Sequence, residues 1–215
     1  MNTVFLDGKR TIGRNTFQND EDTMKFQAPI ATGRSVTGVP TGRLALWWVL
    51  ASEIVIFGGL ITIYLLYRLG NPSWGAEAEH TSIPAGAFNT FVLLTSSLSV
   101  VLSHAAAEEK EFTKAFRLLW YTIGGGFVFL LVKAYEYTSE ITQGFTMFRN
   151  VFWSFYYTAT GLHAAHVLAG MVIMAIISLD VRKGRNPQRV EFIGIYWHFV
   201  DAVWIFLFPL LYIAR

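Results

Sequence analysis

The chain has 215 residues, of which 53% are apolar and only 15% are charged. An ordinary soluble domain is about one-quarter charged, so this composition, with a mean hydropathy of +0.40, excludes that class and indicates an integral membrane protein. There is no cysteine and the net charge is only +2. These values exclude disulfides and thiolate-bound clusters and give no support for nucleic-acid binding.

The first 43 residues are polar and lack the short apolar core of a signal peptide. They contain basic residues such as Lys9 and Arg10 and an acidic run at residues 20–22. We expect residues 1–43 to form a polar, mostly irregular N-terminal tail in the cytoplasm. The alternative is a clasp that lies along another subunit.

From Leu44 onward, five apolar runs are long enough to cross a bilayer, which takes about 20 residues of helix. Lipid-exposed backbone must satisfy its own hydrogen bonds, which favours helices over other forms. The predicted fold is therefore an all-α membrane protein, with a five-transmembrane-helix bundle in residues 44–215. The expected spans are about 44–68, 86–107, 115–138, 151–179 and 192–214.

Small residues and one proline predict local features of the spans. The third span contains glycines at residues 124–126, and the fourth contains Gly161, Ala165 and Ala169 at four-residue steps. Small residues let transmembrane helices approach closely, so we expect both sets to pack against other helices. Pro209 should kink the last span, because its ring removes one backbone hydrogen bond.

Basic residues near the span ends predict the direction of insertion, since Lys and Arg concentrate on the cytoplasmic side. If the N-terminus is cytoplasmic, ten of them lie inside and three outside. The inner set is Lys25, Arg34, Arg43, Lys110, Lys114, Arg117, Arg182, Lys183, Arg185 and Arg189, and the outer set is Arg68, Arg149 and Arg215. We therefore expect a cytoplasmic N-terminus and an external C-terminus.

Ionisable side chains inside a membrane span are costly, so each one is a candidate functional or structural residue. Those well within the spans are Glu53, His163, His166, His198 and Asp201, while Lys133, Glu136 and His104 lie nearer to span ends. Lys133 and Glu136 are three residues apart, a spacing that predicts an ion pair on one helix face.

The histidine spacing allows two interpretations. His163 and His166 are three residues apart, as are His198 and Asp201, so each pair shares a helix face. One interpretation is a haem held between His163 or His166 and His198 on another helix. The interpretation we favour is structural, with buried neutral histidines satisfied by Asp or Glu, either as a His198–Asp201 pair or across helices.

Glu53 has only Ser52 as a polar neighbour in the sequence. Burial disfavours the charged form of an unpaired carboxyl. We expect a neutral carboxyl, or one bonded to a lipid head group. The alternative is a proton relay, which requires a chain of such groups.

Four blocks of this sequence resemble subunit III of the haem–copper cytochrome c oxidases, in the family's order. "SEIVIFGGL" (52–60) is similar to its Ser-Glu helix, and "KAYEY" (133–137) to its Glu-Tyr motif, although Lys133 stands where Gln is common. "SFYYTATGLHAAHVLAG" (154–170) contains the pattern TGxHxxHV, and "YWHFVDAVWIFLF" (196–208) resembles the final helix. The five spans match the short bacterial form, which lacks the first two helices of the seven-span form.

The resemblance implies a non-catalytic subunit of an oxidase in the bacterial inner (plasma) membrane, an enzyme only at the level of the complex. Haems and copper would lie in subunits I and II, and this chain would hold no catalytic, metal or cofactor site. It would pack on subunit I, with a small subunit IV as a further partner and a respiratory supercomplex as a further level of assembly. It would bind structural phospholipid and support proton uptake and stability while electrons pass from cytochrome c to O₂. Lipid-binding or structural roles are expected for Glu53, Glu136, His163, His166, His198 and Asp201.

Other functions stay open at this point. The corresponding subunit of quinol oxidases also has five spans, and a related subunit is associated with nitric oxide reductase. A haem-bearing membrane anchor would carry electrons itself. A proton-coupled transporter would use Glu53, but the lack of internal repeats in the sequence argues against it.

Overall fold

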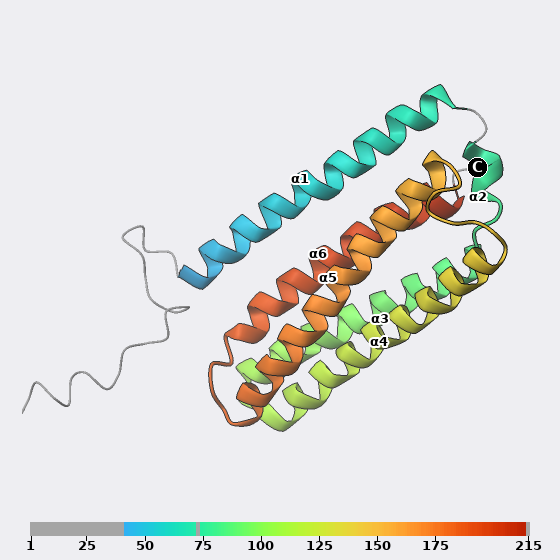
Figure 1. Ribbon diagram of the computed structural model, residues 1–215. Helices are drawn as coiled ribbons and strands as arrows, with labels where there is room; N and C mark the ends of the chain where they lie inside the picture. Colours follow the sequence, from blue (N-terminus) through green and yellow to red (C-terminus); the bar gives the residue numbers. More distant parts are fainter. Residues whose placement is uncertain (1–40, 72–73, 214–215) are drawn as a thin grey trace, which may run out of the picture. The chain divides into compact units, whose positions relative to one another are not determined.

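The computed structural model describes residues 41–71 and 74–213, and every regular element within them is helical. Five of these helices are long and apolar enough to cross a membrane, which confirms the predicted fold. In chain order the elements are α1 (Thr41–Gly70), the short α2 (Trp74–Ala78), α3 (Ile83–Glu108), α4 (Phe112–Thr142), α5 (Val151–Arg182), α6 (Arg189–Phe208) and the π-helical η3 (Pro209–Ile213) (Figure 1). Most of the expected N-terminal tail at residues 1–43 lies outside the described residues.

Three of the spanning helices end in the same way. The residues that follow α3, α4 and α5 and adopt a positive φ are Lys110 (63°), Gly144 (86°) and Gly184 (68°). In each case the next amide donates to a carbonyl five residues earlier, at 2.9 Å for Glu111 to Ala106 and 3.0 Å for both Phe145 to Glu140 and Arg185 to Asp180. This Schellman arrangement satisfies end carbonyls and stops each helix before a short loop.

Helices α3, α4, α5 and α6 form a bundle within residues 44–215. Helix α3 packs against α4 and α6, and α5 packs against the same two helices. Ten of the 20 residues of α6 are buried, against three of the 30 residues of α1, so α6 is the more central of the two. Helix α1 lies beside the bundle (Figure 1) and reaches it through individual side chains, such as Tyr64, whose hydroxyl donates to the carbonyl of Leu210 at 3.0 Å.

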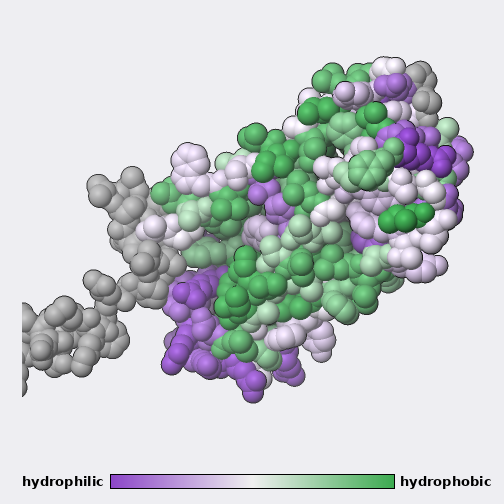
Figure 2. Space-filling view, viewed as in Figure 1, coloured by the Kyte–Doolittle hydropathy of each residue, from purple (hydrophilic) through white to green (hydrophobic). Residues whose placement is uncertain are grey.

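The lateral surface of the helices is mostly apolar. Figure 2 shows hydrophobic side chains over the flanks and hydrophilic ones gathered towards the two ends. On α1, Trp48 is 72% exposed and Leu69 is 84% exposed. Such a surface suits lipid or the apolar face of another membrane subunit, rather than water.

The last span changes its helical pattern at Pro209, where a kink was expected. The α-helical pattern of α6 stops at Phe208, and a wider π-helical turn begins at Pro209. Proline has no N–H for the regular backbone hydrogen bond, and the wider turn accommodates its loss. The segment carries Tyr212 into a buried position among polar groups of α4 and α5.

The structure separates the small residues that pack from those that do not. A Cβ on Gly125 would lie 2.7 Å from the Cβ of Ser96, whereas one on Gly124 would meet nothing within 4 Å. The expectation for the fourth span was wrong for two of its three residues, because Ala165 and Ala169 are exposed. Gly170, one residue further on, packs instead, with a Cβ position 3.1 Å from the Trp197 ring.

We expect Gly125→Ala to lower the free energy of unfolding by about 1–3 kcal/mol, since Ser96 Cβ is fixed to the backbone and cannot swing away. Gly124→Ala is the matched control, and it should be neutral or slightly stabilising because alanine is the better helix former. Thermal unfolding of the purified chain in detergent measures both. Equal midpoints for the two variants would contradict the close approach of α3 and α4.

Candidate functional site

Glu53 on α1 and His166 on α5 meet inside the membrane-spanning part of the chain. Glu53 Oε2 lies 3.0 Å from His166 Nε2, and both side chains are largely covered. The approach is that of a close ion pair rather than a well-directed hydrogen bond. Phe57, one helical turn after Glu53, places its ring edge-on to the same imidazole at 5.4 Å. The carboxyl that had no partner in the local sequence therefore finds one on another helix.

The other ring nitrogen of His166 bonds within its own helix. His166 Nδ1 lies 2.8 Å from the carbonyl oxygen of Leu162, which can only accept, so Nδ1 carries a hydrogen. Nε2 is therefore the ring nitrogen that faces Glu53 Oε2, at 3.0 Å.

His163 faces the centre of the bundle, whereas His166 faces Glu53. Its ring is completely buried, stacks on Trp204 at a centroid distance of 5.2 Å, and meets Phe129 edge-on at 5.3 Å. Neither ring nitrogen has a hydrogen-bond partner in the described part of the chain. Aromatic packing, rather than a carboxylate, holds this imidazole.

His198 and Asp201 do not form the internal pair that their spacing suggested. His198 Nδ1 is hydrogen-bonded to the hydroxyl of Ser97 on α3, 2.5 Å away. Asp201 is only 4% exposed, and neither of its carboxyl oxygens has a hydrogen-bond partner among the described residues. Ser97 also lies near this carboxyl, but without hydrogen-bond geometry.

No other polar group among the described residues depends on the Asp201 carboxyl for a hydrogen bond. We therefore expect Asp201→Asn to leave the isolated chain as stable as the unmodified one. A gain of up to about 1 kcal/mol is expected if the carboxylate is charged, since a neutral amide costs less to bury. Ser97→Ala, which removes the His198 hydrogen bond, is the comparison variant and should lower stability. Thermal unfolding in detergent distinguishes them, and a clear loss with Asp201→Asn would reveal a hydrogen-bond donor to Asp201.

A buried polar cluster connects α4, α5 and η3. Lys133 Nζ donates to Glu136 Oε2 at 2.9 Å, to Tyr156 Oη at 3.0 Å and to Tyr212 Oη at 2.7 Å. The hydroxyl of Tyr156 in turn donates to Glu140 Oε1 at 2.8 Å. The Lys133–Glu136 ion pair expected from the spacing is present, and it belongs to a five-residue network.

The three histidines of the haem interpretation face different neighbours. His163 is held by aromatic rings, His166 by Glu53 and the Leu162 carbonyl, and His198 by Ser97. The arrangement does not present two imidazoles to one ligand. Within residues 41–71 and 74–213, no three His, Asp or Glu side chains gather in a way that could hold a metal ion.

Comparison with known proteins explains the four sequence blocks. The family model described as "Cytochrome c oxidase subunit III" matches residues 37–214, which is most of the chain. The chain belongs to the cytochrome c oxidase subunit III family. The match runs through all five spanning helices, so it includes Glu53, the histidines and the Lys133 cluster.

Individual members of the subunit III family are similar over most of their length. Cytochrome c oxidase subunit 3 of Corynebacterium diphtheriae is 35% identical over 173 residues, covering 77% of this chain and 84% of that protein. The protein of the same name from Thermostichus vulcanus is 37% identical over 169 residues, covering 76% and 83%. That of Alkalihalophilus pseudofirmus is 30% identical over 177 residues, covering 79% and 85%.

The sequence did not predict several residues that take part in the polar contacts of this subunit III chain. Glu140, Tyr156 and Tyr212 complete the Lys133 cluster, and Ser97 is the partner of His198. One signal was available, because Glu140 follows Glu136 by four residues and so lies on the same helix face. The tyrosines and the serine gave none, since their roles depend on which helices become neighbours.

Proposed function

We propose that this chain is the subunit III of a haem–copper terminal oxidase of aerobic respiration. In this proposal it holds no redox centre, and the oxidoreductase activity belongs to the complex. The observation that carries the proposal is the family match across residues 37–214. The similar proteins named cytochrome c oxidase subunit 3 favour cytochrome c over quinol as the electron donor of the complex.

The partners in this proposal are subunits I and II, which would carry the haems and copper, and a small subunit IV. The exposed apolar flanks of the helices support a lateral interface with other membrane subunits and with lipid, including structural phospholipid. Helix α1 contributes large exposed side chains such as Trp48 and Val55. The buried polar groups then serve to hold the helices of this subunit in register.

The proposed topology has a cytoplasmic N-terminus and an external C-terminus in a bacterial plasma membrane. Its support is the excess of basic residues at one end of the spans, where Lys110, Lys114, Arg182 and Lys183 lie near the ends of their helices. In this orientation, the end of the molecule that carries α2 and η3 faces the outside.

We further propose that the subunit supports proton uptake and stability of the oxidase during turnover. The support is the Glu53–His166 pair, which places two ionisable side chains 3.0 Å apart inside the membrane-spanning region. Ionisable groups at such depth commonly mark proton pathways in membrane proteins.

Deletion of the chain from its host tests this function. We expect an oxidase core that keeps its haems, copper and initial electron transfer, while proton uptake slows or activity is lost sooner during turnover. Absorption spectra, stopped-flow electron transfer and activity against turnover number measure these properties. Failure of the core to acquire haem would point instead to a role in assembly, and unchanged uptake and durability would remove the proposed support role.

A further inference from the structure

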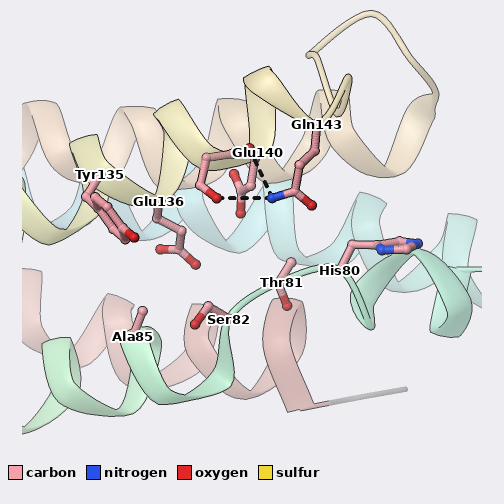
Figure 3. Close-up of a pocket in the computed structure, with 9 residues that line it drawn as sticks. His80, Thr81, Ser82, Ala85, Tyr135, Glu136, Glu140 and Gln143 are labelled. Carbon is pink, nitrogen blue, oxygen red and sulfur yellow. Dashed lines mark hydrogen bonds between the residues drawn. The ribbon is translucent and has the colours of Figure 1, made fainter.

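A polar pocket of about 280 Å³ lies where α3 begins and α4 ends (Figure 3). It is separate from the Glu53–His166 pair and lies at the end of the molecule that carries α2. Its lining comes from the turn before α3, the first turn of α3 and the last turns of α4. The lining residues are His80, Thr81, Ser82, Ala85, Tyr135, Glu136, Ser139, Glu140 and Gln143.

Two buried carboxylates in this lining each leave one oxygen without a partner. Glu136 and Glu140 are one helical turn apart, and their residues are only 4% and 3% exposed. Glu136 Oε2 accepts from Lys133 and Tyr212, and Glu140 Oε1 accepts from Tyr156. Glu136 Oε1 and Glu140 Oε2 have no hydrogen-bond partner in the described residues. The hydroxyl of Tyr157 lies near the Glu140 carboxyl, but it donates to the carbonyl of Phe145. Both carboxyl groups are drawn on the pocket side of α4 in Figure 3.

The charges around the pocket do not balance. Lys133 supplies the one ammonium group of the cluster, and its three donors are directed to Glu136, Tyr156 and Tyr212. No Lys or Arg is among the pocket-lining residues, and the His80 ring packs against Phe145 at 4.4 Å. Two carboxylates therefore face one cation, and an unbalanced buried charge is costly.

We propose that this pocket binds a hard divalent cation, with Ca²⁺ as the best fit. Glu136 Oε1 and Glu140 Oε2 would be its charged ligands, and the two charges of the ion would offset both carboxylates. Ca²⁺ accepts carboxylate, amide and hydroxyl oxygens and water in flexible geometry, so two carboxylates suffice in a pocket with room for water.

Neutral oxygens around the pocket complete the ligand set. The amide nitrogen of Gln143 donates to the backbone oxygen and hydroxyl of Ser139, at 3.1 Å and 3.0 Å. The carbonyl oxygen of Gln143 is then available to a cation. The hydroxyl of Ser82 lies on the opposite wall, so a bound ion would tie the start of α3 to the end of α4 (Figure 3).

The test counts Ca²⁺ bound to the purified oxidase that contains this chain, after treatment with a chelator. We expect the unmodified complex to bind one more Ca²⁺ than the Glu140→Gln variant, or to bind it at least about tenfold more tightly. Glu79→Gln is the matched control, because it removes an exposed acidic charge at the same end without touching the pocket. Ca²⁺ sites in other subunits are present in every variant complex, so the difference in bound Ca²⁺ reports this pocket alone.

A second variant keeps the test decisive if Glu140→Gln fails to assemble. Gln143 is exposed at the end of α4, so Gln143→Ala should fold normally and weaken Ca²⁺ binding less than Glu140→Gln does. Equal Ca²⁺ binding in the unmodified complex, Glu140→Gln and Gln143→Ala would overturn the site and leave a proton as the neutralising group. Displacement of Ca²⁺ by millimolar Na⁺ but not by Mg²⁺ would overturn the divalent assignment.

Discussion

Lys133→Met is expected to lower the free energy of unfolding by about 3–5 kcal/mol, the largest effect of any single substitution considered for this chain. The change leaves Glu136 buried without its ammonium partner and removes the donor of three hydrogen bonds. It also frees Tyr156 and Tyr212 from the group that holds them together. Unfolding of the purified chain in detergent, by heat or by increasing denaturant, measures the loss.

Two further variants identify the cause of that loss. Lys133→Gln keeps hydrogen-bond donors for the tyrosines but removes the charge, so it should cost less than Lys133→Met. In a chain that already carries Lys133→Met, Glu136→Gln should lower the free energy of unfolding much less than it does in the unmodified chain. The Glu136 carboxylate has then already lost its ammonium partner. Lys183→Met, at an exposed position, is the control. An effect of Lys133→Met no larger than that control would show that the cluster does not stabilise the fold.

Glu53→Ala is expected to cost about 1–3 kcal/mol and to loosen α1, because it leaves His166 Nε2 buried without its partner. Helix α1 has few other polar links to the bundle among the described residues, and association of helices in lipid has no large hydrophobic term to replace this one. Accessibility of a cysteine introduced at Phe57 to a membrane-permeable thiol reagent, together with thermal unfolding, would report both effects. Ser52→Ala is the control, since the Ser52 hydroxyl bonds only within its own helix, to the Val49 carbonyl.

Glu53→Gln separates a structural role from a proton-handling role. The glutamine amide can donate to a neutral imidazole, so the contact with His166 and the yield of assembled complex should be preserved. An amide cannot take up or release a proton as a carboxyl does, so proton uptake per assembled complex should slow if the pair handles protons. Normal yield with unchanged uptake would restrict the pair to a structural role, and uptake measured against pH is the deciding readout.

The sequence by itself determined the class of fold, because length and apolarity are properties of each span alone. Five runs of about 20 apolar residues must be helices in lipid, and the helices that formed include each expected run up to the last described residue. The structure extends α4 well beyond its expected end at residue 138, to Thr142, which brings Glu140 into the helix. The family, too, could be recognised from four short blocks, since their order and spacing are linear information.

Only the tertiary structure decided which polar groups meet. His163 and His166 are three residues apart, yet one stacks on Trp204 and the other meets Glu53, because positions three apart on a helix still differ by about one-sixth of a turn. That difference is enough to direct one ring to the centre of the bundle and the other to α1. Likewise, the three consecutive glycines at residues 124–126 look alike in sequence, but a Cβ would clash on Gly125 and Gly126 and would meet nothing within 4 Å on Gly124. Such outcomes depend on the rotation and neighbours of whole helices, which residue spacing along one helix does not encode.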